Sequence, residues 1–164
     1  MRRGEDKPEL LAINEKMIEH LNKSWNWIGV NAEEIIQTND FGNIIFKTNK
    51  GDYWRICPEE LSCGKIANDE SELNQRMNDK EFVEDWKMES LVNLAKSEFG
   101  ELAETEKYCF IIPAVIGGAY SKENLGKINF KELIASSGDL AFQIKDLPNG
   151  QEVILRVINA PNKG

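Results

Sequence analysis

The sequence predicts an α+β fold: a mixed, mostly antiparallel sheet that begins with a β-hairpin and is covered by helices, in a single domain. The first observation is the hairpin itself, because two runs rich in β-branched and aromatic residues, Ile44–Thr48 and Tyr53–Cys57, flank the turn-forming residues 49–52. The second is that amphipathic helical patterns alternate with further strand-like runs along the chain. The third is the length of 164 residues, which is typical of one domain. We expect this domain to span residues 1–164, with frayed ends at 1–9 and 159–164.

Side chains alternate between the two faces of the predicted hairpin. In its first strand, Ile44 and Phe46 share one face. Ile45 lies on the other face together with Asn43 and Lys47, so we expect this strand to be half buried. A two-stranded hairpin is only marginally stable alone, and further strands and a layer of helices must therefore pack against it.

The chain before the hairpin predicts one helix and an entry segment. Residues 10–22 have an amphipathic helical pattern. Trp25 and Trp27 follow, and we interpret them as lids on the core rather than as a ligand-binding box. Residues 31–37 form a short connector, helical or strand-like, and residues 39–42 turn the chain into the hairpin.

After the hairpin we expect a third strand and two helices. Residues 61–67 fit a short strand, and residues 69–72 fit the capped first turn of a helix. A longer helix begins after the caps at residues 78–79 and ends before Gly100. Because this helix has two apolar sides, it either kinks near Trp86 or packs its first turns against a different partner from its second half. We favour the second alternative.

The last third of the chain predicts a central strand, a helix and a final strand. Residues 107–112 are apolar on both faces, as in a strand inside a sheet. We interpret Gly117 and Gly118 as a bulge or tight turn, because no Lys-Ser/Thr pair follows at the spacing of a phosphate-binding loop. The remaining expected elements are a single turn at 121–124, a strand at 126–130, a helix over 130–144 that Ser137-Gly138 can interrupt, a turn at 147–150 and a strand at 153–158.

Charge divides the chain into an acidic segment and a nearly neutral remainder. The net charge is −8, and residues 59–106 alone hold fourteen Asp and Glu against five Lys and Arg, a local net charge of −9. An acidic surface repels nucleic acid and anionic membranes, and it attracts basic partners. The alternative is that the acidic face only aids solubility. We therefore expect neither nucleic acid nor a membrane as a direct partner.

The residues needed for catalysis or for a metal site do not occur in a suggestive arrangement. His20 is the only histidine. Cys57, Cys63 and Cys109 match neither a disulfide framework nor a metal-binding spacing, and we interpret them as small buried hydrophobic side chains. Many of the carboxylates stand where helices begin, as the helix dipole favours. The sequence therefore predicts a binding protein with no enzymatic activity, catalytic residue, metal or cofactor.

The N-terminal residues carry no signal for export that we can identify. Two arginines are followed by acidic residues rather than by an apolar segment. Apolar runs in the chain are far shorter than the roughly 20 residues of a membrane helix. We expect the protein to act in the cytoplasm.

Four blocks of sequence resemble a known family. They are residues 51–59, the pair Asp85-Trp86, residues 117–125 and residues 138–150. Their most specific parts are the motif Gly-Gly-x-Tyr, followed by Glu-Asn, and the motif Gln-Ile-x-Asp-Leu-Pro-x-Gly. In these blocks the chain resembles the C-terminal domain of immunity proteins that are paired with type VI secretion DNase effectors, a domain formerly of unknown function. The resemblance covers about residues 25–158, and the chain looks like a stand-alone form without the GAD-related domain that precedes it in longer members.

The resemblance implies a partner and a function. An immunity-type domain binds a cognate toxin and neutralises it by occlusion, and here we expect a basic toxin domain, in particular a nuclease. The acidic segment agrees with such a partner by charge complementarity. We expect a monomer or a weak dimer. Five residues of the resembling blocks are of structural types and are not assigned as contacts: Trp54, Trp86, Gly117, Gly118 and Pro148.

From the charge pattern we expect the toxin-binding surface to include eight carboxylates: Glu59, Glu60, Asp69, Glu70, Glu72, Asp79, Glu81 and Glu84. The alternative function is a regulatory or adaptor binding module, unrelated to toxins, on a SUKH-like scaffold. Genomic context separates the two, because a neighbouring gene for a large secreted effector favours the immunity function.

Overall fold

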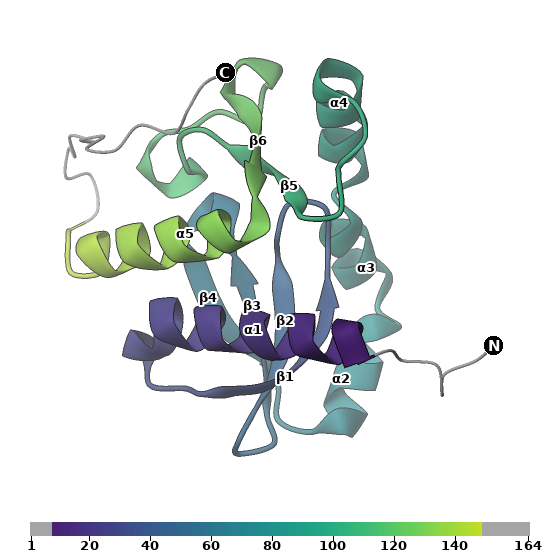
Figure 1. Ribbon diagram of the computed structural model, residues 1–164, viewed down its shortest axis with the longest axis vertical. Coiled ribbons are helices and arrows are strands. Elements are labelled where there is room, and N and C mark those ends of the chain that lie inside the picture. Colours follow the sequence, from purple (N-terminus) through teal and green to yellow (C-terminus); the bar gives the residue numbers. More distant parts are fainter. Residues whose placement is uncertain (1–7, 149–164) are drawn as a thin grey trace.

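A four-stranded sheet forms the centre of the protein (Figure 1). The computed structural model describes residues 8–148, and side chains from residue 14 onward. The strands lie in the order β1 (Ala32–Thr38), β2 (Ile44–Thr48), β3 (Tyr53–Cys57) and β4 (Ser62–Ala67). All three of their pairings are antiparallel, which confirms the predicted α+β class with its mostly antiparallel sheet. The connector expected at 31–37 is the strand β1, and the strand expected at 61–67 is β4.

The hairpin of β2 and β3 has the bounds that the sequence predicts. Ile44 lies opposite Ile56, and Gly51 in the loop has a φ of 87°, which glycine adopts without strain. The prediction that β2 is half buried is wrong, because Ile45 is as fully buried as Ile44. Helices cover both faces of the sheet, so β2 has no face in water.

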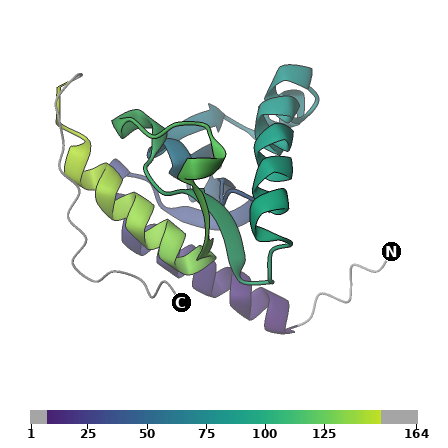
Figure 2. The same cartoon turned by 90° about the horizontal axis from the view of Figure 1, so that it is seen from above.

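Two long helices, α1 (Pro8–Trp25) and α5 (Phe130–Ile144), cover one face of the sheet. They lie side by side in Figure 2. The core on this face contains side chains from both helices and from β1, β2 and β3: Leu21, Trp25, Ala32, Ile44, Phe46, Ile56, Ile134 and Ala141. The expected interruption of the second helix at 137–138 is not found, because α5 continues through both residues.

The two early tryptophans close this core, as the sequence predicts. Trp25 is buried, and Trp27 stacks on it with 5.8 Å between ring centroids. The indole N–H of Trp27 donates to the carbonyl oxygen of Gly138 at 3.2 Å. Trp27 follows α1 in the short 3-10 helix η2 (Asn26–Ile28), so this bond ties the end of α1 to α5.

Helices α2 (Glu70–Met77) and α3 (Lys80–Lys87) cover the other face. Asp69 caps the first of them by accepting a hydrogen bond from the Glu72 N–H at 2.9 Å, and Asp79 caps the second. The core on this side contains Ile45, Tyr53, Ala67, Leu73 and Trp86.

The single helix expected between residues 79 and 99 is two helices. Met88 has a φ of 46° and separates α3 from α4 (Glu89–Phe99). Trp86 at the end of α3 packs against the four-stranded sheet, whereas Ala95 of α4 packs against a second sheet. The favoured alternative, different packing partners for the two halves, is therefore confirmed, and the chain also breaks close to Trp86.

Strands β5 (Glu106–Phe110) and β6 (Leu125–Asn129) form the second, antiparallel sheet. Tyr108 and Phe110 pack there with Phe41, which comes from the turn before β2. The prediction that residues 107–112 form a central strand is wrong. The last two residues of that apolar run lie beyond the end of β5 and are exposed, so the run does not mark a strand buried on both faces.

Three 3-10 turns complete the described fold: η3 (Pro58–Glu60), η4 (Ala114–Ile116) and η5 (Lys122–Asn124). The single turn expected at 121–124 is η5, and the strand expected at 126–130 is β6. The strand expected at 153–158 lies outside the described residues, as do part of the turn at 147–150 and most of the ends expected to fray. The extent of the domain over residues 1–164 stays a prediction.

Gly138 lies where α5 contacts α1, and a Cβ atom there would lie 2.5 Å from the carbonyl oxygen of Ser24. At an exposed helical position, a Gly→Ala substitution stabilises by about 1 kcal/mol. We expect Gly138→Ala instead to lower the free energy of unfolding by about 1–3 kcal/mol, because one helix must move. Denaturant unfolding measures this change. Gly64→Ala, where a Cβ atom would meet nothing within 4 Å, is the control, and a more stable Gly138→Ala protein would contradict the prediction.

Candidate functional site

A pocket of about 300 Å³ opens between β3, η3 and the junction of α3 with α4. Five of its lining side chains are carboxylates, which come from η3, from the end of α3 and from the start of α4: Glu59, Glu60, Glu84, Asp85 and Glu89. Among the lining residues, only Arg55 is cationic. We call this cavity the acidic pocket.

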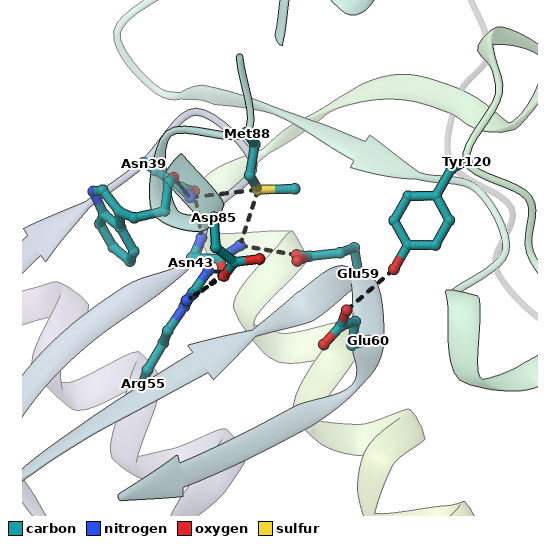
Figure 3. A network of polar contacts seen from close by, with 9 residues as sticks. Asn39, Asn43, Arg55, Glu59, Glu60, Asp85, Met88 and Tyr120 are labelled. Atoms are coloured by element: carbon teal, nitrogen blue, oxygen red, sulfur yellow. Dashed lines mark hydrogen bonds and ion pairs between the residues drawn. The ribbon is translucent and has the colours of Figure 1, made fainter. Parts of the chain in front are cut away.

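A buried amide connects the acidic pocket to the central sheet (Figure 3). Asn43 immediately precedes β2 and is fully buried. Its Oδ1 accepts hydrogen bonds from Nε and Nη2 of Arg55 at 3.1 and 2.8 Å, and its Nδ2 donates to Oε1 of Glu59 at 2.8 Å. Arg55 also forms an ion pair of 2.7 Å with the exposed Asp85, and its guanidinium lies over the Trp86 ring. Arg55 is one cation against five carboxylates, so the pocket keeps a net negative charge.

A second asparagine fixes the break between α3 and α4. Nδ2 of Asn39 donates to the carbonyl oxygen of Trp86 at 2.8 Å and lies 3.5 Å from the sulfur of Met88. Its Oδ1 accepts from the backbone N–H groups of Phe41 and Asn43 at 3.0 and 2.9 Å. The left-handed conformation of Met88 costs roughly 1–2 kcal/mol for a residue with a side chain. The contacts of Asn39 hold the chain in that conformation, and the start of α4 thereby faces the pocket.

Glu59 is the buried carboxylate of the acidic pocket, with 6% of its surface exposed. Burial raises the pKa of its carboxyl group from 4.5 to about 7. The hydrogen bond from Asn43 and the charge of Arg55 oppose this shift, and the charge of Glu60 adds to it. Glu59 therefore changes its charge near neutral pH, unlike a carboxylate in water.

Tyr120 reaches the pocket from the segment between β5 and β6, and Figure 3 shows it on the other side of Glu59 and Glu60 from Asp85. Its hydroxyl donates to Oε2 of Glu60 at 3.1 Å. Its ring packs edge-on against Phe110, with 5.0 Å between centroids. Burial and the Glu60 carboxylate raise the pKa of Tyr120 to about 12, so the hydroxyl stays protonated and remains a donor.

One buried side chain shapes the segment that carries Tyr120. Nδ2 of Asn124 donates to the carbonyl oxygens of Ile112 and Ala119, each at 2.9 Å, and its Oδ1 accepts from the N–H of Ile112 at 2.8 Å. Gly118 lies so close that a Cβ atom would come within 1.7 Å of the Ile112 carbonyl oxygen, and Gly117 has a φ of 104°. The predicted tight turn at this glycine pair is therefore confirmed. The motif Gly-Gly-x-Tyr with its following Glu-Asn specifies the shape of this segment.

The eight carboxylates expected at the toxin-binding surface do not form one cluster. Glu59, Glu60 and Glu84 line the acidic pocket, although Glu59 is buried within it. The other five lie at the starts of α2 and α3: Asp69, Glu70, Glu72, Asp79 and Glu81.

Three of these five also stabilise the local backbone. Asp69 and Asp79 are the helix caps described above, and Oε1 of Glu72 accepts from the backbone N–H of Asn68 at 2.7 Å. Such bonds do not prevent a contact with a partner, since Asp69 and Asp79 are exposed. The assignment of these residues to a toxin interface stays a prediction.

Sequence reasoning selected only three of the residues that line the pocket, and it missed Asp85, Glu89 and Tyr120 among others. Asp85 and Tyr120 lie within the blocks that resemble the immunity family, which is the signal that could have found them. Glu89 joins the pocket only because the chain breaks at Met88, and the sequence pattern predicts one continuous helix there.

The chemistry that this arrangement supports is the binding of cations and hydrogen-bond donors. Within residues 8–148, no group of three or more His, Cys, Asp and Glu side chains is arranged to hold a metal ion. His20 lies on α1, which packs against the other face of the sheet. Cys57 also lines the pocket, but burial raises the pKa of its thiol to about 12, so it is not a nucleophile near neutral pH.

All three cysteines are free and half-buried. Burial likewise raises the pKa of Cys63 to about 12 and that of Cys109 to about 11. As for membranes, the helices in the described part of the chain are all too short or too polar to span one.

The raised pKa of Glu59 predicts a pH-dependent effect of Glu59→Gln on stability. Well below pH 4.5 the carboxyl group is protonated in both the folded and unfolded states. As the pH rises to about 7, the unfolded state ionises first, so the wild-type protein loses stability relative to the variant. We expect Glu59→Gln, which keeps an acceptor for Asn43, to be more stable than wild type by up to about 3 kcal/mol at pH 8 and nearly equal at pH 4.5.

Urea unfolding across this pH range measures the free energy of unfolding of the variant and of wild type. The other titrating groups are the same in both proteins, so their contributions cancel in the difference. Glu98→Gln, on the exposed face of α4, is the control and should show little change. A difference between Glu59→Gln and wild type that does not vary with pH would show that Glu59 is not perturbed by burial.

Comparison with known families gives one match. Residues 67–141 match a family described as T6SS immunity protein Tdi1, C-terminal, where T6SS denotes the type VI secretion system. The matched segment supplies Glu84, Asp85, Glu89 and Tyr120 of the acidic pocket and the segment shaped by Asn124. No curated protein matches the chain. The matched family is the one that the sequence blocks resemble, and this confirms the resemblance over residues 67–141, which are somewhat less than half of the chain.

Proposed function

We propose that this chain binds a cognate secreted toxin, a nuclease effector of a type VI secretion system, and neutralises it by occlusion. The observation that carries the proposal is the match of residues 67–141 to an immunity family. An immunity protein acts by binding rather than by catalysis, so this role requires neither enzymatic activity nor a cofactor. The cytoplasm is the place for this action, because a delivered nuclease meets its DNA substrate there.

The charge of the described surface supports a basic partner. A nuclease presents basic residues to the phosphates of its substrate. Here seven of the eight selected carboxylates lie outside the core along η3, α2 and α3, and only Glu59 is buried. Complementary charges accelerate encounter and select the partner. A protein that covers the basic surface of the toxin keeps DNA away from it.

Co-expression with a candidate toxin domain, taken from a secreted effector whose gene adjoins the gene for this chain, tests the function directly. We expect cells that carry the toxin alone to stop growing and to lose intact DNA, and cells that also express this chain to keep both. Purified chain should also form a stable complex with the toxin domain. Continued DNA loss despite a soluble, folded chain would refute the immunity function, and a rescue from a toxin that leaves both DNA and RNA intact would refute the assignment of that toxin to nucleases.

Charge reversal tests the electrostatic part. We expect replacing Glu60, Glu70, Glu81 and Glu84 by Lys to slow association with the toxin domain at low salt by at least about tenfold, and to reduce the dependence of the rate on ionic strength. Stopped-flow fluorescence or surface plasmon resonance measures both quantities.

The matched control replaces Glu15, Glu19, Glu33 and Glu34 by Lys. These side chains are exposed on α1 and β1, and the substitution changes the net charge by the same amount. If both variants associate equally slowly, only the net charge matters and the assigned surface is wrong. If neither differs from wild type, charge does not guide the encounter.

A further inference from the structure

The segment between β5 and β6 concentrates the exposed apolar side chains of the described chain. Residues 111–120, which we call the apolar loop, contain four of the seven exposed large apolar side chains among the described residues: Ile111, Ile112, Val115 and Tyr120. Ile111 and Val115 are the most exposed, at 62% and 61%. Single exposed apolar side chains are common on proteins, but four of them within a segment of ten residues are the kind of concentration that interaction sites show.

The apolar loop is also longer than the fold requires. β5 and β6 are antiparallel neighbours, and two residues are enough to join such strands. The chain instead uses residues 111–124. Connections of this length in a small domain usually carry a function.

The backbone of the apolar loop is fixed by hydrogen bonds within the protein. The Asn124 side chain donates two hydrogen bonds to this backbone and accepts one from it. In addition, the N–H of Gly118 donates to the carbonyl oxygen of Pro113 at 3.0 Å, and the N–H of Ile111 donates to the carbonyl oxygen of Asn124 at 2.7 Å. Asn124 is itself buried. Because the loop is already ordered, little conformational entropy remains to be lost when a partner binds its side chains.

The acidic pocket adjoins the apolar loop through Tyr120. Its ring belongs to the loop, and its hydroxyl bonds Glu60 on the rim of the pocket. The rim also holds the exposed carboxylates Glu84, Asp85 and Glu89, whereas the pocket's only cation, Arg55, is already paired with Asp85. A rigid apolar surface beside uncompensated negative charge fits a partner with apolar side chains next to basic ones.

We propose that the apolar loop and the rim of the acidic pocket together form the surface that contacts the toxin domain. Ile111 and Val115 pack into an apolar recess of the toxin and slow dissociation. A basic side chain of the toxin, an arginine or a lysine, enters the acidic pocket beside Tyr120. The inference rests on the proposed function, and it locates the contact at the α3–α4 junction and the apolar loop rather than along the whole acidic segment.

The test uses the toxin domain identified by the co-expression experiment, in a catalytically inactivated form, and measures its binding to the full chain and its variants. We expect Ile111→Ser combined with Val115→Ser to weaken binding about 100-fold, mainly through faster dissociation. The melting temperature of the free variant should stay within about 2 °C of wild type, because both side chains face solvent. Phe99→Ser, which removes an exposed apolar side chain at the other end of α4 from Glu89, is the control and should bind like wild type.

Three outcomes would overturn the inference, and they are distinguishable. If the double variant binds like wild type, the proposed function stands but the contact surface lies elsewhere. If the melting temperature of the double variant falls by more than about 5 °C, the two side chains serve the packing of the chain itself. If wild-type chain does not bind the toxin domain, the proposed function fails together with this surface.

Discussion

Much of the structure depends on the burial of β2 from both sides. Helices α1 and α5 cover one face of the central sheet and α2 and α3 the other, so polar groups at the start of β2 cannot reach water and need partners within the protein. Asn43 meets this requirement by accepting two hydrogen bonds from Arg55 and donating one to Glu59. An unpaired buried amide would cost roughly 1–3 kcal/mol, and an unpaired charge more.

The hydrogen bonds that satisfy the interior also build one wall of the acidic pocket. Arg55 connects the buried Asn43 to Asp85 at the surface. Asn39 fixes the chain where α3 ends and α4 begins, because it donates to the carbonyl oxygen of Trp86. The carboxylates of η3, α3 and α4 therefore face the same pocket, which forms only when these elements pack together. On the opposite side, the glycine pair and Asn124 bring Tyr120 to Glu60. The binding surface that we propose is thus continuous with the hydrogen bonds that join Asn43, Arg55 and Glu59.

The sequence predicts the elements well where the signal is local. Three kinds of element follow from short patterns with a direct physical cause: the hairpin of β2 and β3, the helix starts near residues 69 and 79, and the turn at Gly117-Gly118. Three features were not predictable in this way: the burial of Ile45, the break at Met88 and the exposure of Ile111 near the end of the apolar run 107–112. Each depends on contacts between distant segments, such as the bond from Asn39 to Trp86. For the same reason, the charge pattern identified an acidic region but not the pocket, whose members are brought together by tertiary packing.

If the proposed mode of neutralisation is correct, the toxin domain covers the apolar loop and the rim of the acidic pocket. Hydrogen–deuterium exchange of the chain, free and in complex with the toxin domain, measures that directly, because bound surfaces become protected at backbone amides. We predict protection that is concentrated in residues 111–124 and around the junction of α3 and α4, with α1 and β1 unchanged. Protection confined to α1 and β1, or no change on adding the toxin domain, would contradict the proposed mode of neutralisation.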